Sequence, residues 1–279
     1  MGYSRFDSSL GARAAHVMAA TALSLLAWPL PAAADAPPAV AAPAAAVQPW
    51  AAIKAAMPDD FSGAWVHDMT SGNLPKRGSP NEKHFTLGDG TVIPIRPQAE
   101  KLYRERVAMG MTEHPFANTA ARCLPIGTPG NMMGAPYPVQ FVQRPDFIAI
   151  LLEEGGQFRA VHMNGTHPEE IIPSYLGHSI GHWEGKTLVI DTVAMREETT
   201  LDFNGLPHSE QMRVIEKIKR IAPDKLVDEI TIDDPATYFK PFTFTSVFTK
   251  TAEELIEYIC EDTRMRASPD GRQNYSLPK

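Results

Sequence analysis

Five of the nine histidines in this sequence lie between residues 162 and 208, and histidine is the side chain best suited to proton chemistry near neutral pH. Two of them, His178 and His182, share the run LGHSIGHWEGKTLVIDT with Asp191. A carboxylate that orients an imidazole makes a general base, and two histidines with one carboxylate also make a minimal metal site. A solvated polar face without chemistry is the third interpretation, and the sequence leaves all three open.

The same run contains Gly177-His178-Ser179-Ile180-Gly181, which matches the G-x-S-x-G pattern of serine hydrolases. A nucleophile elbow needs a strand, a sharp turn at the serine and then a helix. Here a β-branched run follows from Thr187, and Gly185-Lys186 suits a two-residue hairpin turn, so Ser179 is placed within a strand. We therefore predict that Ser179 is not a nucleophile. The cross-strand pairs predicted for the hairpin are Glu184–Thr187, His182–Val189 and Ile180–Asp191.

A second candidate is a carboxylate in the run EQMRVIEKIKRIA, residues 210–222. Period-two alternation places Glu216 on one face with Met212, Val214 and Ile218, so its side chain is predicted to point inward. A buried carboxylate must be paired or must shift its pKa upward. Arg220 on the same face is the candidate partner, and both a structural ion pair and a functional acid inside the barrel remain open.

These observations predict an acid–base set and a few ligand contacts. The acid–base set comprises His162, His182, His208, Asp191 and Glu216, and the ligand contacts are Trp183, Arg220 and Phe244. They favour a cofactor-independent enzyme that moves protons on a small apolar or aromatic molecule, as a lyase, isomerase or hydrolase does. A non-catalytic ligand carrier with the same cavity is the alternative, and a metal-dependent enzyme is the second alternative. No metal and no organic cofactor are predicted.

The elements that must position these residues are mostly strands. Short β-rich runs separated by turn residues predict a mainly β protein with one or two short helices, in which an antiparallel sheet closes or folds on itself. Gly63-Ala64-Trp65 resembles the G-x-W pattern that opens lipocalin-type barrels, and this resemblance implies an antiparallel barrel of the calycin or lipocalin type. A barrel of this size can enclose one small ligand. One helix is predicted from Pro97 to Met109, with a stop at Gly110. The predicted strands cover residues 139–143, 146–155, 157–165, 178–184, 187–195, 210–222, 226–233, 242–250 and 255–262.

The ends and the charge narrow the class of protein. Residues 1–34 have the basic start, apolar middle and small-residue end of a signal peptide, which predicts a periplasmic or secreted protein with no membrane segment after cleavage. A Pro/Ala-rich tether over residues 35–58, one barrel domain over 59–265 and a tail over 266–279 complete the predicted organisation. The net charge of −7 argues against nucleic-acid binding. Cys123 and Cys260 are expected to pair, with two buried thiols as the alternative.

The runs GHSIGHWEGKTLVIDT, CLPIGTPGNM, GLPHSEQMRVIEKIKR and TIDDPATYFKPF together resemble a family of exported bacterial proteins. The resemblance covers roughly residues 60 to 262, and the W-E-G…L-V-x-D-T hairpin is its most specific part. It implies export and β architecture rather than a particular reaction. The sequence departs from the family pattern at His182, where an arginine is usual, and at Asn164 and Lys186, where aspartates are usual.

Overall fold

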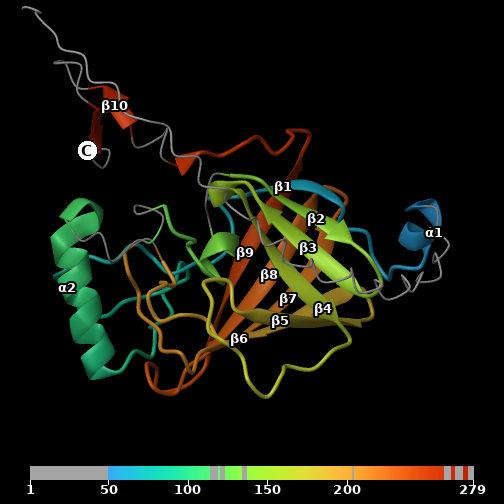
Figure 1. Ribbon diagram of the computed structural model, residues 1–279. Helices are drawn as coiled ribbons and strands as arrows, with labels where there is room; N and C mark the ends of the chain where they lie inside the picture. The colour runs from blue at the N-terminus through green and yellow to red at the C-terminus, as the bar shows by residue number, and fades with distance from the viewer. Residues whose placement is uncertain are drawn as a thin grey trace, which may run out of the picture. The chain divides into compact units, whose positions relative to one another are not determined.

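The computed structural model describes residues 50–113, 119, 123–133, 137–202, 204–260, 265–267 and 273–275, all of which belong to one compact unit, Val47–Lys279. Nine strands, neighbours in chain order, close into a barrel (Figure 1). Their bounds are β1 Gly63–His67, β2 Val139–Gln143, β3 Phe147–Leu152, β4 Gln157–Met163, β5 His178–Glu184, β6 Thr187–Val193, β7 Arg213–Ala222, β8 Lys225–Asp233 and β9 Phe242–Thr251. The remaining elements are α1 Trp50–Ala55, α2 Pro97–Glu113, the short 3-10 helices η2 Gly130–Met132 and η3 Glu154–Gly156, and β10 Met265–Ala267 paired with β11 Gln273–Tyr275.

The predicted fold class, a mainly β barrel with few helices, is confirmed. One pairing departs from the expected antiparallel pattern, because β4 and β5 run parallel, with His162 opposite Ile180. Parallel neighbours need a long crossover connection, and residues 164–177 supply it. All other neighbouring pairs in the barrel are antiparallel.

The hairpin of β5 and β6 has the predicted register. Glu184 pairs with Thr187, His182 with Val189 and Ile180 with Asp191, around a turn in which Gly185 has φ = 60°. That left-handed conformation suits the first turn position of a type II′ hairpin, which glycine adopts without strain, and Lys186 at the second position has no positive φ. Ser179 pairs with Thr192 inside the strand, so no nucleophile elbow is present there.

Three predicted boundaries are corrected. The helix that begins at Pro97 continues beyond Gly110 to Glu113, because one glycine lowers helix propensity without ending a helix. The predicted strand at 255–262 does not form over 255–259, and residues 261–264 lie outside the described part. The short helix α1 occupies part of the predicted tether. Residues 1–34 and the tether up to 49 lie outside the described residues, as does most of the tail.

Cys123 and Cys260 form the expected disulfide. The bond joins residues 137 positions apart, and it attaches the segment after β9 to the loop that precedes β2. Cys260 was predicted to lie in the strand 255–262, but it does not lie in a strand. Among the described residues, no helix is both long enough and apolar enough to cross a membrane.

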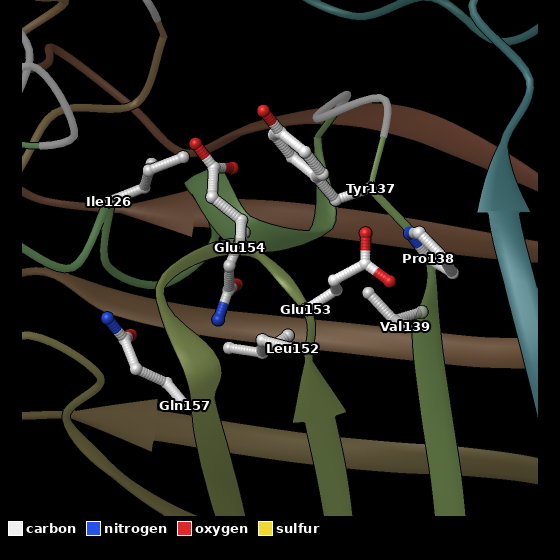
Figure 2. Close-up of a pocket in the computed structure, with 9 residues that line it drawn as sticks. Ile126, Tyr137, Pro138, Val139, Leu152, Glu153, Glu154 and Gln157 are labelled. Carbon is white, nitrogen blue, oxygen red and sulfur yellow. The ribbon is translucent and has the colours of Figure 1, made fainter. Parts of the chain in front are cut away.

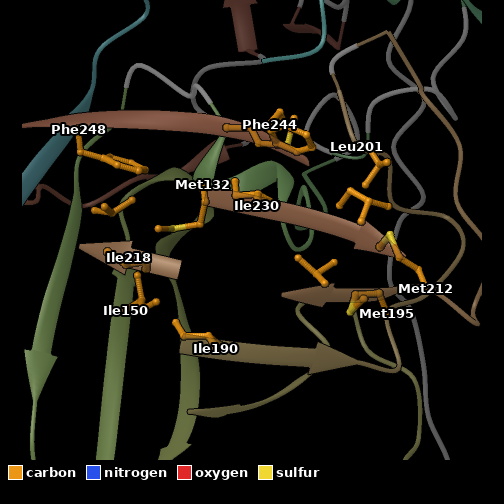
Figure 3. Packing of buried hydrophobic residues seen from close by; sticks show 14 of the residues in the cluster. Met132, Ile150, Ile190, Met195, Leu201, Met212, Ile218, Ile230, Phe244 and Phe248 are labelled. Carbon is orange, nitrogen blue, oxygen red and sulfur yellow. The ribbon is translucent and has the colours of Figure 1, made fainter. Parts of the chain in front are cut away.

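The barrel interior is packed with side chains from every strand. Trp65 is fully buried, and its indole Nε1 donates a hydrogen bond to the carbonyl of Phe61 at 2.7 Å. Ile150, Ile218 and Phe244 from three different strands meet around Met132, which reaches in from η2 (Figure 3). Alternate residues of each strand point inward, as period-two patterning requires.

Candidate functional site

One end of the barrel is covered by loops, and three of the cavities lie at this end, which we call the mouth. It comprises residues 69–77 after β1, 123–133 before β2, η3 between β3 and β4, and 201–204 in the β6–β7 connection. The 123–133 loop is held at several points. Its Thr128 Oγ1 donates to the carbonyl of Leu176 at 3.0 Å, and Ser246 Oγ donates to the carbonyl of Met132 at 2.7 Å. Gly127 needs to be glycine, because its φ is 92° and an added Cβ would lie 2.6 Å from the Thr199 Cγ2 atom.

Buried side chains occupy the inside of the barrel, where the ligand cavity was expected. Met132 is fully buried and belongs to the same hydrophobic cluster as Ile218, Ile230 and Phe248 (Figure 3). Three cavities lie at the mouth, and a further one of about 410 Å³ is lined by Ala64, Gln140 and residues 251–255.

The largest cavity at the mouth has a volume of about 570 Å³. Leu74, Ile126 and Met133 provide apolar walls, and Met69, which is 66% exposed, lies at the rim. Lys76, Arg77, Asp202 and Asn204 add polar groups along one side. Arg77 Nε donates to Asn204 Oδ1 at 3.3 Å, and Tyr103 of α2 donates to Asp202 Oδ2 at 2.5 Å. The result is a mainly apolar pocket with a few polar groups, which is the usual character of a small-molecule site.

Two smaller cavities of about 20 and 70 Å³ lie beside the disulfide and share Ile126, Glu154 and Gln157. Figure 2 shows the smaller one, with the Glu154 carboxyl and the Tyr137 hydroxyl extending in the same direction. Burial raises the pKa of Glu154 to about 7. Neither Glu154 nor this cavity was found from the sequence. The only signal was the pair Glu153-Glu154 near the end of the predicted strand 146–155, which reads equally well as the polar end of a strand.

A buried polar cluster crosses the barrel interior. Arg159 on β4 donates through Nη1 to Glu216 Oε1 at 2.9 Å and through Nη2 to Glu216 Oε2. The same guanidinium donates to Ser179 Oγ at 3.0 Å and to Thr192 Oγ1 at 2.6 Å. Arg159 and Glu216 are 1% and 0% exposed, so this bidentate ion pair has no access to solvent.

Glu216 points inward, as predicted, but its partner is Arg159 and not Arg220. Arg220 lies near the end of β7, next to the β-bulge between Arg220 and Ala222. Its side chain is therefore at the end of the strand and away from Glu216. There its Nε donates to Asp59 Oδ1 at 3.4 Å, and its guanidinium lies 5.5 Å from the Trp65 ring centroid. Arg159 was missed, although the alternation of QFRAVHM places it on the same face as Val161 and Met163.

Asp228 on β8 is the third ionisable residue of this cluster. It is fully buried, and neither carboxyl oxygen has a hydrogen-bond partner of good geometry. Burial raises its pKa well above the usual range, and the charge and proximity of Glu216 raise it further, while Arg159 lowers it. Protonation of Asp228 is therefore favoured, and this reduces the negative charge that the buried cluster would otherwise carry. That reduction is what a fully buried group of this kind requires.

The predicted acid–base residues do not converge. His162 and His182 lie on the outer surface of the barrel, where His182 Nε2 is 3.4 Å from Glu184 Oε1. Asp191 also faces outward and forms an ion pair with Arg213, with Nε and Oδ1 2.9 Å apart. His208 is buried in the β6–β7 connection, hydrogen-bonded to Thr199 Oγ1 at 2.6 Å, and burial lowers its pKa. None of these side chains lines the cavities at the mouth or contacts Glu216.

The outer surface does bring other histidines together. His178 lies 5.2 Å from His162 in a stacked arrangement, and its Nδ1 shares a hydrogen bond of 2.9 Å with His167 Nδ1. Burial, then the charges of His167 and His162, lower the pKa of His178. No group of three or more His, Cys, Asp or Glu side chains with metal-binding geometry occurs in the described part of the chain.

Of the two predicted aromatic ligand contacts, Phe244 is a core residue and Trp183 is partly buried against the core. Phe244 is fully buried on β9 beside Phe242, with ring centroids 6.1 Å apart. Trp183 packs on Phe61 with centroids 5.4 Å apart, and its Nε1 is buried without a hydrogen-bond partner. Neither lines a cavity at the mouth.

Ser179 is expected to stay unreactive towards a serine-directed phosphonate. The side chain is 1% exposed, and its Oγ is engaged by Arg159 and by Thr192 at 2.9 Å. Ser179→Ala should lower the free energy of unfolding by about 1–3 kcal/mol, because a buried hydrogen bond to a charged group is lost. Denaturant unfolding measures the loss, and mass spectrometry after phosphonate treatment checks the labelling. A covalent adduct on Ser179 in the folded protein would contradict the assignment.

Neither a protein-family model nor a curated protein matches this chain. Among solved structures, two mutants of the fluorescent protein UnaG are each 14% identical and cover 42% of this chain and 72% of theirs, with TM-scores of 0.26 and 0.25. At TM-scores this low the likeness says nothing about ligand or activity, and the barrel assignment comes from the strand pairing described above.

Proposed function

We propose that this protein is an exported binding protein for one small, largely apolar molecule, which it holds at the mouth of the barrel. The observation that carries the proposal is the cavity of about 570 Å³. Pockets for drug-sized ligands usually measure roughly 300–1,000 Å³ and combine apolar walls with a few polar groups. This cavity has both properties.

The lining residues favour a ligand with an apolar body and one polar or anionic end. Leu74, Ile126 and Met133 offer contacts to an aromatic or aliphatic body. Met69 and Met133 add polarizable, flexible side chains that adapt to irregular shapes. At the rim Lys76 is exposed and can reach a carboxylate or sulfonate, whereas Asp202 already accepts a hydrogen bond from Tyr103.

A carrier fits this arrangement better than the proton-transfer enzyme favoured by the sequence. An enzyme of that kind needs at least two titratable groups that converge on the substrate. The predicted groups lie on the outer surface, in a buried loop or in a closed ion pair, and none lines the cavity. Ligand binding alone makes no such demand.

Export and membership of the exported bacterial family are part of the same proposal. The leader pattern over residues 1–34 and the quoted motifs support it. A disulfide adds to this support, because such bonds persist in oxidising compartments and are rare in the cytosol. Fractionation of cells that produce the full chain, with sequencing of the mature N-terminus, tests it.

Binding of an anilinonaphthalene sulfonate probe, which has an aromatic body and an anionic end, tests the cavity. We expect saturable one-site binding to the full chain, and Met69→Trp, which fills the rim, should weaken it by about tenfold or more, equivalent to about 1.4 kcal/mol. Ile221→Trp is the matched control, since Ile221 is 55% exposed on β7 and does not line the cavity. Non-saturable binding, or equal affinities for the two variants, would remove the cavity as the ligand site.

A further inference from the structure

The two small cavities beside the disulfide hold polar groups that the fold leaves unused. Glu154 Oε2 is buried and has no hydrogen-bond partner. On the opposite loop, Asn131 presents a buried amide whose Oδ1 and Nδ2 atoms both lack partners. Both residues line the cavity of about 20 Å³. Buried polar groups in folded proteins are nearly always hydrogen-bonded, so these atoms are available to hydrogen-bond a polar ligand.

The side chains around these groups determine which charge a ligand of these cavities must carry. The polar residues lining the two cavities are Asn131, Tyr137, Glu153, Glu154, Gln157 and Tyr258, and no lysine or arginine is found among their described lining residues. Glu153 Oε2 accepts a hydrogen bond from the backbone N–H of Ile256 at 2.9 Å, which leaves Glu154 as the acid without a partner. Burial raises the pKa of Tyr137, and the neighbouring Tyr258 and then the charges of Glu154 and Glu153 raise it further. This region therefore attracts positive charge.

The aromatic residues point to the same kind of ligand. Tyr137 and Tyr258 lie edge to face, with ring centroids 5.2 Å apart, and each lines one of the two cavities. Aromatic faces next to a carboxylate favour organic cations, which gain both ion-pair and cation–π attraction. A primary ammonium group supplies three donors, which suit the Glu154 carboxylate, the Asn131 carbonyl and a tyrosine hydroxyl.

We propose that these cavities form a binding site for the ammonium group of a small primary amine, with Glu154 as its counter-ion and Asn131 as a second hydrogen-bond acceptor. The volumes limit the ligand to a short chain. One water needs about 10–15 Å³ by this measure, so 20 Å³ takes the ammonium head and 70 Å³ takes a few carbon atoms. The site is separate from the larger cavity, with which it shares only Ile126 of the described lining residues.

Calorimetric titration of the full chain with ethylammonium chloride tests the proposal. We expect saturable binding that is on the order of 30-fold tighter at pH 8.5 than at pH 5.5, because only ionised Glu154 attracts the ligand and its pKa is about 7. The amine itself stays protonated at both pH values. At pH 7 binding should release part of a proton from Glu154, which titrations in buffers of different ionisation enthalpy measure without any substitution.

Glu154→Gln should weaken binding at pH 8.5 by about tenfold or more and abolish its pH dependence. Glu169→Gln is the matched control, because Glu169 is exposed and lines neither cavity. Sodium chloride and n-propanol, which lack the ammonium donors, should not compete. Equal competition by n-propanol, affinity independent of pH, or no proton release would overturn the proposal. Probe binding at the larger cavity should be the same in wild type and Glu154→Gln, so the two proposals can fail separately.

Discussion

Replacing Cys123 and Cys260 together by serine is expected to lower the free energy of unfolding by about 5 kcal/mol. The bond closes a loop of 137 residues, and the chain-entropy model assigns about that value to a loop of this length. For a domain of this size the change corresponds to a decrease in Tm of roughly 10–20 °C. Reduction of the wild type should produce the same decrease, and differential scanning calorimetry of both samples measures it.

The controls for this prediction are the single variants and a thiol count. Cys123→Ser and Cys260→Ser should each cost as much as the double variant, since one serine already prevents the bond. Thiol titration of the folded wild type should find no reactive group before reduction. Two free thiols, or a double variant as stable as the wild type, would show that the bond does not form. The segment fixed by Cys260 also covers the ammonium site, because Tyr258 contacts Tyr137 and Ile256 contacts Glu153.

Local patterns were sufficient to predict much of the barrel. The β5–β6 register follows from the Gly185-Lys186 turn and the alternation on either side, because a slip of one residue would turn Trp183 away from the core. The same alternation placed Glu216 and Phe244 inside. These features depend on neighbours within a few residues, which is the range that periodicity can detect.

Features set by distant parts of the chain could not be predicted. Arg159 and Glu216 are 57 residues apart, and their pairing requires the barrel to be closed. The parallel pairing of β4 with β5 depends on how the 164–177 connection crosses over, and no local signal encodes that path. The packed interior includes Met132, which belongs to a Pro- and Gly-rich loop outside the sheet. The cavities at the mouth form between such loops, so they were not visible in the sequence.

For the histidines, the sequence suggested a site that the structure does not show. The prediction was based on their proximity in the sequence. His178 and His182 do share a face with Asp191, as the hairpin predicts. That face is the outer one, where Asp191 pairs with Arg213 and His182 with Glu184. Period two fixes which residues share a face, but the identity of the inward face depends on the rest of the barrel. Here Ser179, Gly181 and Trp183 are the inward set.

The cluster of Arg159, Glu216 and Asp228 leads to the last prediction. Arg159→Met should lower the free energy of unfolding by about 3–5 kcal/mol at pH 7, because it leaves two buried carboxyl groups without a cation. Glu216→Gln should cost clearly less. Glu216 and Asp228 both lie close to Arg159, and loss of the Glu216 charge lets Asp228 ionise and take its place as counter-ion. The double variant Glu216→Gln/Asp228→Asn removes both carboxylates and should again cost about 3–5 kcal/mol.

The dependence on pH separates this exchange of partners from simple damage to the core. In the wild type Asp228 has a raised pKa in the folded state, so the folded protein binds more protons than the unfolded chain, and this group's contribution to stability falls as pH rises above about 4. In Glu216→Gln, Asp228 is expected to be ionised beside Arg159, so the variant should not lose this stability as pH rises. The difference between the free energies of unfolding of the wild type and the variant should therefore shrink from pH 5 to pH 8. Urea unfolding at several pH values, with the double variant as control, measures it. A gap that stays constant with pH, or single and double variants of equal stability, would show that Asp228 does not replace Glu216 as the partner of Arg159.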